Sequence, residues 1–175
     1  MIECLVGSEM CIRDSTSFYL FVDKQYSTPF TVLVADLTAE SFALALREFN
    51  LELHDMQFRS QKSLTLNCDR GSQFDTPLVH KTANELHITL TFIGTSSHED
   101  NAFAERHHGI FNQSISKMMT EDVPTDLWSL AVKRTTYTRR RAATRALEGM
   151  SAFQKLGFTV DLSNAMQFYT GLYHL

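Results

Sequence analysis

The chain has 175 residues, of which 43% are hydrophobic and 21% charged, and its formal net charge at pH 7 is −4. This composition is typical of a soluble globular protein, and it excludes a polybasic chain whose overall charge would draw it to nucleic acid or to a membrane. No apolar run approaches the roughly 18 residues that a membrane span needs. We therefore expect no membrane partner and a cytoplasmic location. The length suits one domain with its own core.

The N-terminal segment 1–15 is set apart from the rest. The run from Cys4 to Ser15 resembles the translated adapter read-through that recurs at the ends of proteins from environmental sequence assemblies. We therefore treat this segment as a non-native leader and leave it out of the fold prediction; the alternative is a genuine, poorly structured N-terminus. Residues 16–175 are expected to form a single α+β domain, truncated at both ends. Outside the leader Cys68 is the only cysteine, which indicates neither a disulfide framework nor a cysteine-rich metal site.

The first part of this domain reads as two strands followed by a helix. Phe18–Val22 and Phe30–Leu37 are apolar runs with aromatic and β-branched residues, and the near-continuous apolarity of the second run indicates burial on both faces. Thr38 is a suitable N-cap. The spacing of apolar residues after it predicts an amphipathic helix over Ala39–Phe49.

The next part is less regular. Leu51–Arg59 and Ser63–Cys68 alternate weakly between polar and apolar residues, which predicts a hairpin. Asp69 to Ser72 marks a turn. The run His80 to Thr82 lies outside any strand pattern and is predicted to be loop.

Glu85 to Gly94 has the clearest strand pattern in the chain. Its apolar residues alternate strictly with polar ones, which predicts a half-buried strand. The apolar set faces the core, so His87, Thr89 and Thr91 share the opposite face. A histidine and a threonine two positions apart on one strand face are close enough to act on one small group.

The second half of the chain is predicted to contain two helices and three strands. Helical spacing and acidic residues in the first turn favour a long helix over Glu99–Met119. Leu127–Tyr137 alternates like a strand, Arg139–Leu156 reads as a helix, and Phe158–Leu162 and Gln167–Leu175 read as strands. The predicted fold is therefore α+β, with an antiparallel or mixed sheet and about three helices packed on it.

The strand at Glu85 to Gly94 resembles a known motif. Two-histidine (2H) phosphoesterases, which include RNA 2′,3′-cyclic phosphodiesterases and 2′-5′ RNA ligase-like proteins, carry His-x-Thr/Ser twice, each copy on a strand. The matching positions here are His87, Ile88, Thr89, Leu90, Phe92, Ile93 and Gly94. His174 lies 87 positions after His87 and would begin the second copy, whose Thr or Ser would be the residue after Leu175.

The resemblance implies metal-independent hydrolysis of a cyclic phosphate or a 2′-5′ linkage in an RNA or nucleotide substrate. His87 and His174 would be the general base and general acid, because imidazole titrates near neutral pH. Thr89 would donate a hydrogen bond to the phosphoryl oxygens. On this hypothesis the enzyme needs neither a metal nor a cofactor.

Arginines are concentrated in one stretch of the chain. Arg139, Arg140 and Arg141 form the centre of a basic cluster that runs from Lys133 to Arg145. Local positive charge binds phosphate or an RNA backbone. We predict substrate binding by the three arginines; the alternative is a solvated loop and helix start.

Two other classes of function stay open. One is a non-catalytic α+β domain with a binding or structural role. The other is an acyltransferase fragment, because His107 and His108 begin a run that resembles the His-His-x-x-x-Asp motif of CoA-dependent acyltransferases, with Asn112 in place of the aspartate. The two hypotheses differ in geometry, since the acyltransferase requires His108 at the end of a strand.

Overall fold

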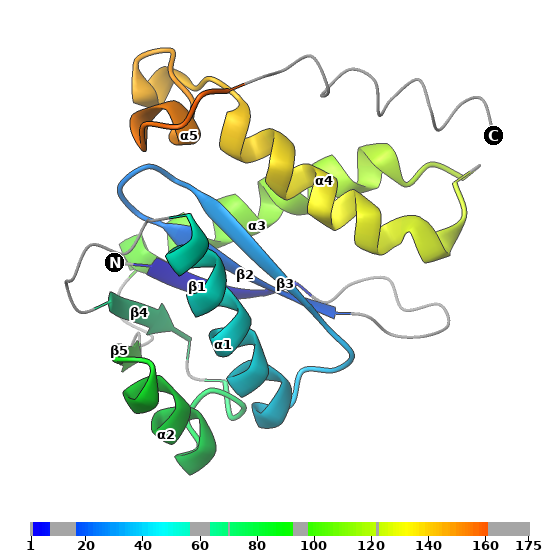
Figure 1. The fold of residues 1–175 in the computed structure, drawn as a ribbon. Helices are drawn as coiled ribbons and strands as arrows, with labels where there is room; N and C mark the ends of the chain where they lie inside the picture. Colours follow the sequence, from blue (N-terminus) through cyan, green and yellow to red (C-terminus); the bar gives the residue numbers. More distant parts are fainter. Residues whose placement is uncertain are drawn as a thin grey trace.

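The computed structural model describes residues 2–7, 17–56, 64–69, 71–92, 98–121 and 123–160, with only the backbone course given for 2–7 and 98–101. These residues form one five-stranded sheet with the order β3-β2-β1-β4-β5 (Figure 1). The strands are β1 (Ile2–Gly7), β2 (Ser17–Asp23), β3 (Pro29–Val34), β4 (Leu64–Cys68) and β5 (Ile88–Phe92). The pairs β1–β2 and β2–β3 are antiparallel, whereas β1–β4 and β4–β5 are parallel. The sheet is therefore mixed.

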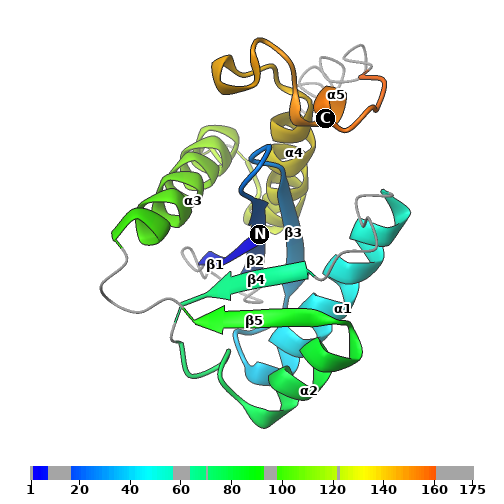
Figure 2. The same cartoon turned by 90° about the vertical axis from the view of Figure 1, so that its left-hand side faces the viewer.

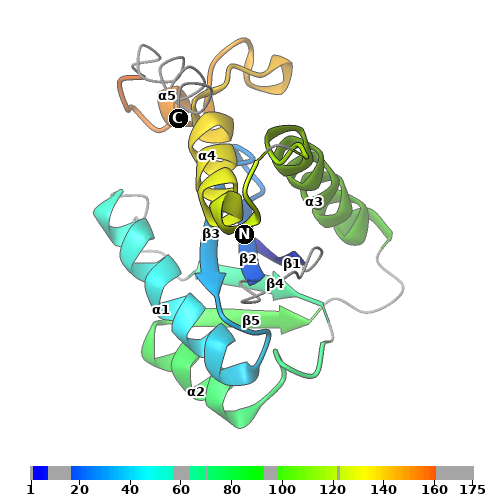
Figure 3. The ribbon, with the colours of Figure 1, turned by 90° about the vertical axis from the view of Figure 1, so that its right-hand side faces the viewer.

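Helices cover both faces of this sheet. They are α1 (Ala39–Asp55), α2 (Pro77–Glu85), α3 (His98–Met118), α4 (Trp128–Arg141) and the short α5 (Ala152–Lys155). One core cluster joins α1 and α2 to one face, and a second joins α3 and α4 to the other. Figure 3 shows the two pairs on opposite sides of the strands. Among the described residues no helix combines the length and apolarity needed to cross a membrane.

Strand β2 divides the two cores. Tyr19 and Phe21 point into the first core, where the ring of Phe21 stacks on Phe49 of α1 at a centroid distance of 4.3 Å. Phe18, Leu20 and Val22 point into the second core with α3 and α4. Because alternate side chains of a strand face opposite ways, a strand that is apolar at every position requires a helix layer on each side.

The prediction of an α+β fold with a mixed sheet is confirmed, and so are several of its elements. Predicted strands at Phe18–Val22 and Phe30–Leu37 correspond to β2 and β3, and the predicted helix at Glu99–Met119 corresponds to α3. Thr38 caps α1 as expected: its hydroxyl oxygen accepts a hydrogen bond from the amide of Ser41 at 3.2 Å.

Other elements differ from the prediction. Leu51 belongs to α1, which runs on to Asp55, and β4 pairs in parallel with β5, so the predicted hairpin is wrong. The predicted loop His80 to Thr82 lies inside α2, which starts with Thr76 as N-cap and a proline in its first turn. The first error arose because weak alternation in a short run does not distinguish a strand from an amphipathic helix.

The largest error concerns Leu127–Tyr137, which was predicted as a strand and forms most of α4. Its buried residues follow a helical spacing that the local alternation hid: Ala131, Val132, Thr135, Thr136 and Arg140. The helix predicted over Arg139–Leu156 is interrupted after Arg141, where the chain forms a 3₁₀ turn and then α5. Positive φ angles at Glu148 and Gly149 mark the break.

The two ends of the chain lie partly outside the described residues. Ile2–Gly7 forms β1, between β2 and β4, and its status as part of a non-native leader stays a prediction. In the predicted strand Phe158–Leu162, residues 158–160 have no regular structure and the remainder lies outside the described residues. The predicted strand Gln167–Leu175 lies wholly outside them.

One buried arginine ties α4 to the rest of the fold. Arg140 is 8% exposed; its Nε donates to the carbonyl oxygen of Pro29 at 2.6 Å, and its Nη1 donates to Glu52 Oε1 at 2.6 Å. Its guanidinium also lies 4.6 Å from the ring centroid of Phe30. These contacts connect the last turn of α4 to the start of β3 and to α1.

We predict that Arg140→Met lowers the free energy of unfolding by about 2 to 3 kcal/mol, because it leaves a carboxylate and a carbonyl oxygen without their donor. Urea denaturation of the two proteins measures the difference. Arg145→Met is the control, since Arg145 is exposed and such changes shift stability by less than about 0.5 kcal/mol. Equal effects of the two substitutions would contradict the structural role of Arg140.

Candidate functional site

The parallel part of the sheet places the carboxyl ends of β4 and β5 side by side, since Cys68 is the register partner of Phe92. Strands β1, β4 and β5 run in the same direction, and ligands of open α/β sheets bind at the carboxyl ends of such strands. Asp69 follows directly after the last residue of β4, and its side chain is exposed. Among the described side chains, this places a carboxylate at the edge where a ligand is expected.

The turn after β4 holds Asp69 in place. The amide of Gly71 donates to Asp69 Oδ1 at 3.1 Å, and the amide of Phe74 donates to the carbonyl oxygen of Gly71 at 3.0 Å. Phe74 is fully buried in the first core. The carboxylate therefore sits on a turn anchored in the core.

Helix α3 starts close to the same edge. His98 follows the last residue of β5 by only six positions, so the first turns of α3 cannot lie far from the carboxyl ends of β5 and β4. Figure 2 shows the arrowheads of β4 and β5 pointing to the side on which the first turns of α3 lie.

Glu105, in the second turn of α3, faces this edge. Helix α3 packs on the sheet through Phe111 and Ile115, and its His107 flank faces Arg139 of α4. Since successive residues turn by about 100° around a helix, Glu105 lies on the opposite flank. Helix α4 covers β3, so the opposite flank of α3 faces β4. Glu105 is exposed there.

The backbone of β1 passes beside this pair of carboxylates. Glu3 in β1 is the register partner of Asn67, two residues before Asp69. Among the side chains that the structure describes, no three His, Cys, Asp or Glu residues gather closely enough to hold a metal ion. The candidate site therefore consists of Asp69 and Glu105, at the carboxyl ends of the parallel strands.

A buried histidine lies two residues after Glu105, on the other flank of α3. His107 is 7% exposed, and its ring lies 4.5 Å from the ring of Phe103. Burial, followed by the positive charges of Arg139 and Arg106, lowers the pKa of His107 from 6.5 to about 4. The side chain is therefore neutral at pH 7. Its neighbour His108 is half-buried and lies 3.5 Å from the side-chain amide of Asn112.

The predicted catalytic residues are not arranged as expected. His87 has a positive φ of 54° in the turn between α2 and β5, where its amide donates to the carbonyl oxygen of Asn84 at 3.1 Å. The strand begins only at Ile88, so His87 and Thr89 do not share a regular strand face, although both are exposed. His174 lies outside the described residues. A catalytic role for these three residues is untested.

The three predicted substrate-binding arginines separate in space. Arg140 is buried in the structural contacts described above. Arg139 turns toward α3 and His107, whereas Arg141 lies over the ring of Tyr137, 3.6 Å from its centroid. They therefore do not form one surface, and their role in substrate binding stays a prediction.

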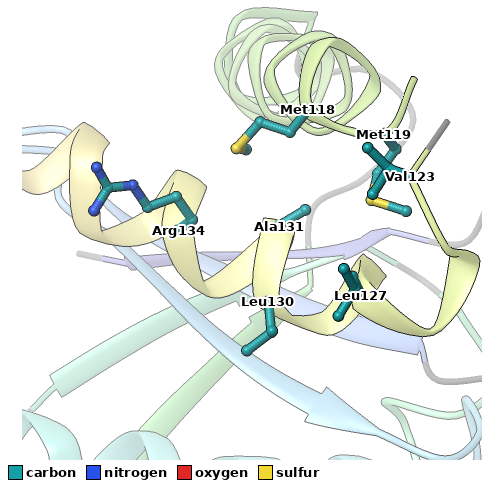
Figure 4. Close-up of a pocket in the computed structure, with 7 residues that line it drawn as sticks. All are labelled: Met118, Met119, Val123, Leu127, Leu130, Ala131 and Arg134. Carbon is teal, nitrogen blue, oxygen red and sulfur yellow. The ribbon is translucent and has the colours of Figure 1, made fainter. Parts of the chain in front are cut away.

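An apolar hollow opens between the end of α3 and the start of α4 (Figure 4). It is lined by Met118, Met119, Val123, Leu127, Leu130, Ala131 and Arg134. The lining contains no carboxylate, histidine or nucleophilic side chain. The hollow therefore lacks the groups that catalysis requires, unlike the edge at Asp69.

The fold matches solved structures, whereas no protein-family model and no curated protein matches the sequence. A chain of the simian T-cell lymphotropic virus intasome, in complex with PP2A regulatory subunit B56 gamma, superposes with a TM-score of 0.73 and 14% identity over 90% of this chain. The HTLV-2 integrase catalytic core domain, in complex with magnesium, has a TM-score of 0.65 and 16% identity, covering 87% of this chain and 93% of that one.

The catalytic core domain of BIV integrase has a TM-score of 0.66 and 16% identity, over 96% of this chain and 97% of that one. This chain spans 54% of the simian virus chain. At these identities the likeness shows the fold alone. The chain has the RNase H-like fold of retroviral integrase catalytic cores.

This likeness overturns the functional hypotheses drawn from the sequence. The resemblance to 2H phosphoesterases is wrong, because only seven positions in and around one strand matched the motif, whereas 87 to 96% of the chain matches the fold of the integrase structures. The acyltransferase hypothesis is also wrong: His107 and His108 lie inside α3 and not at a strand end. Asp69 was predicted only as a turn residue. Glu105 was not predicted, because its sequence context is that of any exposed glutamate in a helix.

The neutral state of His107 makes stability depend on pH. Below pH 6.5 His107 of the unfolded chain binds a proton, whereas His107 of the folded chain stays neutral until about pH 4. The free energy of unfolding therefore falls as the pH falls from 6.5 to 4. We expect His107 to account for about 1 to 2 kcal/mol of this loss, after allowing for solvent screening.

Urea denaturation at pH 7 and pH 4.5 tests this expectation. The loss between the two values should shrink in His107→Gln and stay the same in the control His54→Gln, since His54 is exposed on α1. An unchanged pH dependence in His107→Gln would show that another group causes it.

Proposed function

We propose that this chain is a polynucleotidyl transferase-like domain that breaks and joins phosphodiester bonds of nucleic acid. The observation that carries the proposal is the RNase H-like fold shared with three integrase structures over most of this chain. The positions of Asp69 and Glu105 add a physical reason, since both are exposed carboxylates at the carboxyl ends of parallel strands. A non-catalytic role is not favoured by this arrangement.

The two carboxylates suit a magnesium ion. Mg²⁺ is usually held by one or two carboxylates together with water and substrate phosphates. The HTLV-2 integrase core was solved in complex with magnesium. In this chain Asp69 and Glu105 would hold the ion, which when bound neutralises charge on the phosphate and acidifies water.

The surrounding residues set the positions of these carboxylates. Gly71 donates its amide to Asp69 Oδ1, which leaves the other carboxylate oxygen for a ligand and fixes the orientation of the side chain. Phe111 and Ile115 pack α3 against β2 and so limit the positions that Glu105 can take. A preorganised donor set of this kind is more effective than a mobile one.

We predict that Asp69→Asn and Glu105→Gln each reduce nicking and joining of a DNA duplex by about 100-fold or more, because a lost ligand costs several kcal/mol of transition-state stabilisation. The assay uses the full chain with a labelled duplex and either Mg²⁺ or Mn²⁺, and gel electrophoresis resolves the nicked and joined strands.

Asp55→Asn and Glu48→Gln are the matched controls. Both carboxylates are exposed on α1, on the opposite face of the sheet, so these variants should keep full activity. Activity that survives both Asp69→Asn and Glu105→Gln would place the catalytic site elsewhere. A chain that leaves duplex DNA intact with either metal would contradict the proposed function.

A further inference from the structure

The seam between α3 and α4 changes in character from one end to the other. The two helices run in opposite directions: the end of α3 and the start of α4 share the apolar hollow, whereas the first half of α3 faces the last turn of α4 (Figure 1). This second end is positively charged, although the chain as a whole has a net charge of −4. We call it the polar seam and define it as Arg106, His107 and Arg139.

Arg139 lies on the side of α4 that faces α3. Ala131, Thr135 and Arg139 follow one another at four-residue intervals, which places them on one side of the helix. Ala131 lines the hollow together with Met118 of α3, and Arg139 lies close enough to His107 of α3 to lower its pKa. Ala131 and Thr135 are buried and Arg139 is half-buried. The guanidinium of Arg139 is therefore partly desolvated between the two helices.

The charge of Arg139 has no counterpart in the described part of the chain. Its side chain makes neither an ion pair nor a hydrogen bond there. Burial lowers the pKa of Arg139, with no nearby carboxylate to oppose the shift. The hydroxyl of Thr135, one turn earlier on the same side of α4, is buried and also lacks a hydrogen-bond partner among the described residues. Because buried polar groups usually have partners, two such neighbouring groups indicate a ligand that accepts hydrogen bonds.

Arg106 adds a second positive charge to the polar seam. It is exposed on α3, and its charge, like that of Arg139, lowers the pKa of His107. The two guanidinium groups therefore lie around one imidazole ring. Within the described ranges Arg106 has no ion pair either. Since like charges repel each other, two arginines placed together without a carboxylate favour an anion between them.

We propose that the polar seam binds one phosphate group of the nucleic-acid strand through Arg106 and Arg139. The inference rests on the proposed function in taking nucleic acid as the substrate. Guanidinium groups bind phosphate oxygens through paired N–H donors, and arginine stays charged when it is partly desolvated. Arg140 takes no part, because its guanidinium is committed to Pro29 and Glu52.

The position of Arg106 connects the polar seam to the candidate site. Glu105, Arg106 and His107 are consecutive, and each residue turns by about 100° around α3. Glu105 therefore lies on the flank toward the sheet edge, Arg106 on the outer side and His107 on the flank toward α4. A strand carries one phosphate per roughly 3.4 Å of its axis. A strand that reacts at Glu105 and crosses the outer side of α3 would therefore place another phosphate between Arg106 and Arg139.

The test measures binding of the full chain to a fluorescein-labelled 30-base-pair duplex by anisotropy, over a series of NaCl concentrations and in EDTA. EDTA removes metal-dependent binding and cleavage, so only metal-free contacts are measured. The double variant Arg106→Gln with Arg139→Gln should reduce the slope of log K against log salt by about one, because one phosphate contact contributes roughly 0.9. Arg106→Lys with Arg139→Lys keeps the charge and should keep the slope.

Lys117→Gln with Lys133→Gln is the matched control. It removes the same charge from exposed positions of the same two helices, outside the polar seam, and should leave the slope unchanged. Circular dichroism confirms that each variant is folded.

A second measurement separates a phosphate of the strand from a free anion. The melting temperatures of the wild type and of the Gln double variant are compared in inorganic phosphate and in chloride at equal ionic strength. A phosphate effect that the Gln double variant loses, together with an unchanged DNA slope, would assign the polar seam to a free anion and overturn the inference. A reduced slope supports the inference whether or not free phosphate binds.

An unchanged slope in the Gln double variant, or an equal reduction in the control, would likewise overturn the inference. Failure of the proposed function gives a different pattern. A reduced slope in a chain that never nicks DNA keeps the phosphate site and removes the catalytic proposal. Nicking that depends on Asp69, with an unchanged slope in the Gln double variant, does the reverse.

Discussion

The burial of β2 on both faces is the constraint on which the rest of this fold depends. From Phe18 to Val22 every side chain is buried, alternately in the core under α1 and in the core under α3 and α4. A sheet with such a strand near its centre is stable only when helices cover both sides. That requirement places α3 and α4 on the face opposite α1, with α3 over β1 and β2.

The direction of the strands then decides where chemistry is possible. Part of the sheet is antiparallel, whereas β1, β4 and β5 run in parallel, and β4 and β5 end side by side. The turn after β4 is anchored by buried Phe74, which gives Asp69 a fixed position. Charged groups of the two signs lie on different elements: Asp69 follows β4, whereas Arg134 and Arg141 lie on α4 around the ring of Tyr137.

Arg140 shows why a charged cluster in a sequence does not define a surface. Three consecutive arginines looked equivalent, yet a helix turns by about 100° per residue, so they point in three directions. One is buried against Pro29 and Glu52, one faces His107, and one lies over Tyr137. Helix α4 was predicted as a strand for a related reason. Its buried positions have helical spacing, but short stretches of it alternate between polar and apolar residues as in a strand.

The sequence by itself determined the α+β class, strands β2 and β3, the capped helix α1 and the long helix α3, because these depend on local apolar spacing and on caps such as Thr38. It also marked the turn at Asp69 to Ser72. Only the tertiary structure decided the strand order, the parallel pairing of β4 with β5, and the packing of α3 and α4 on the face opposite α1. These depend on contacts between residues far apart in the chain, which no local pattern encodes.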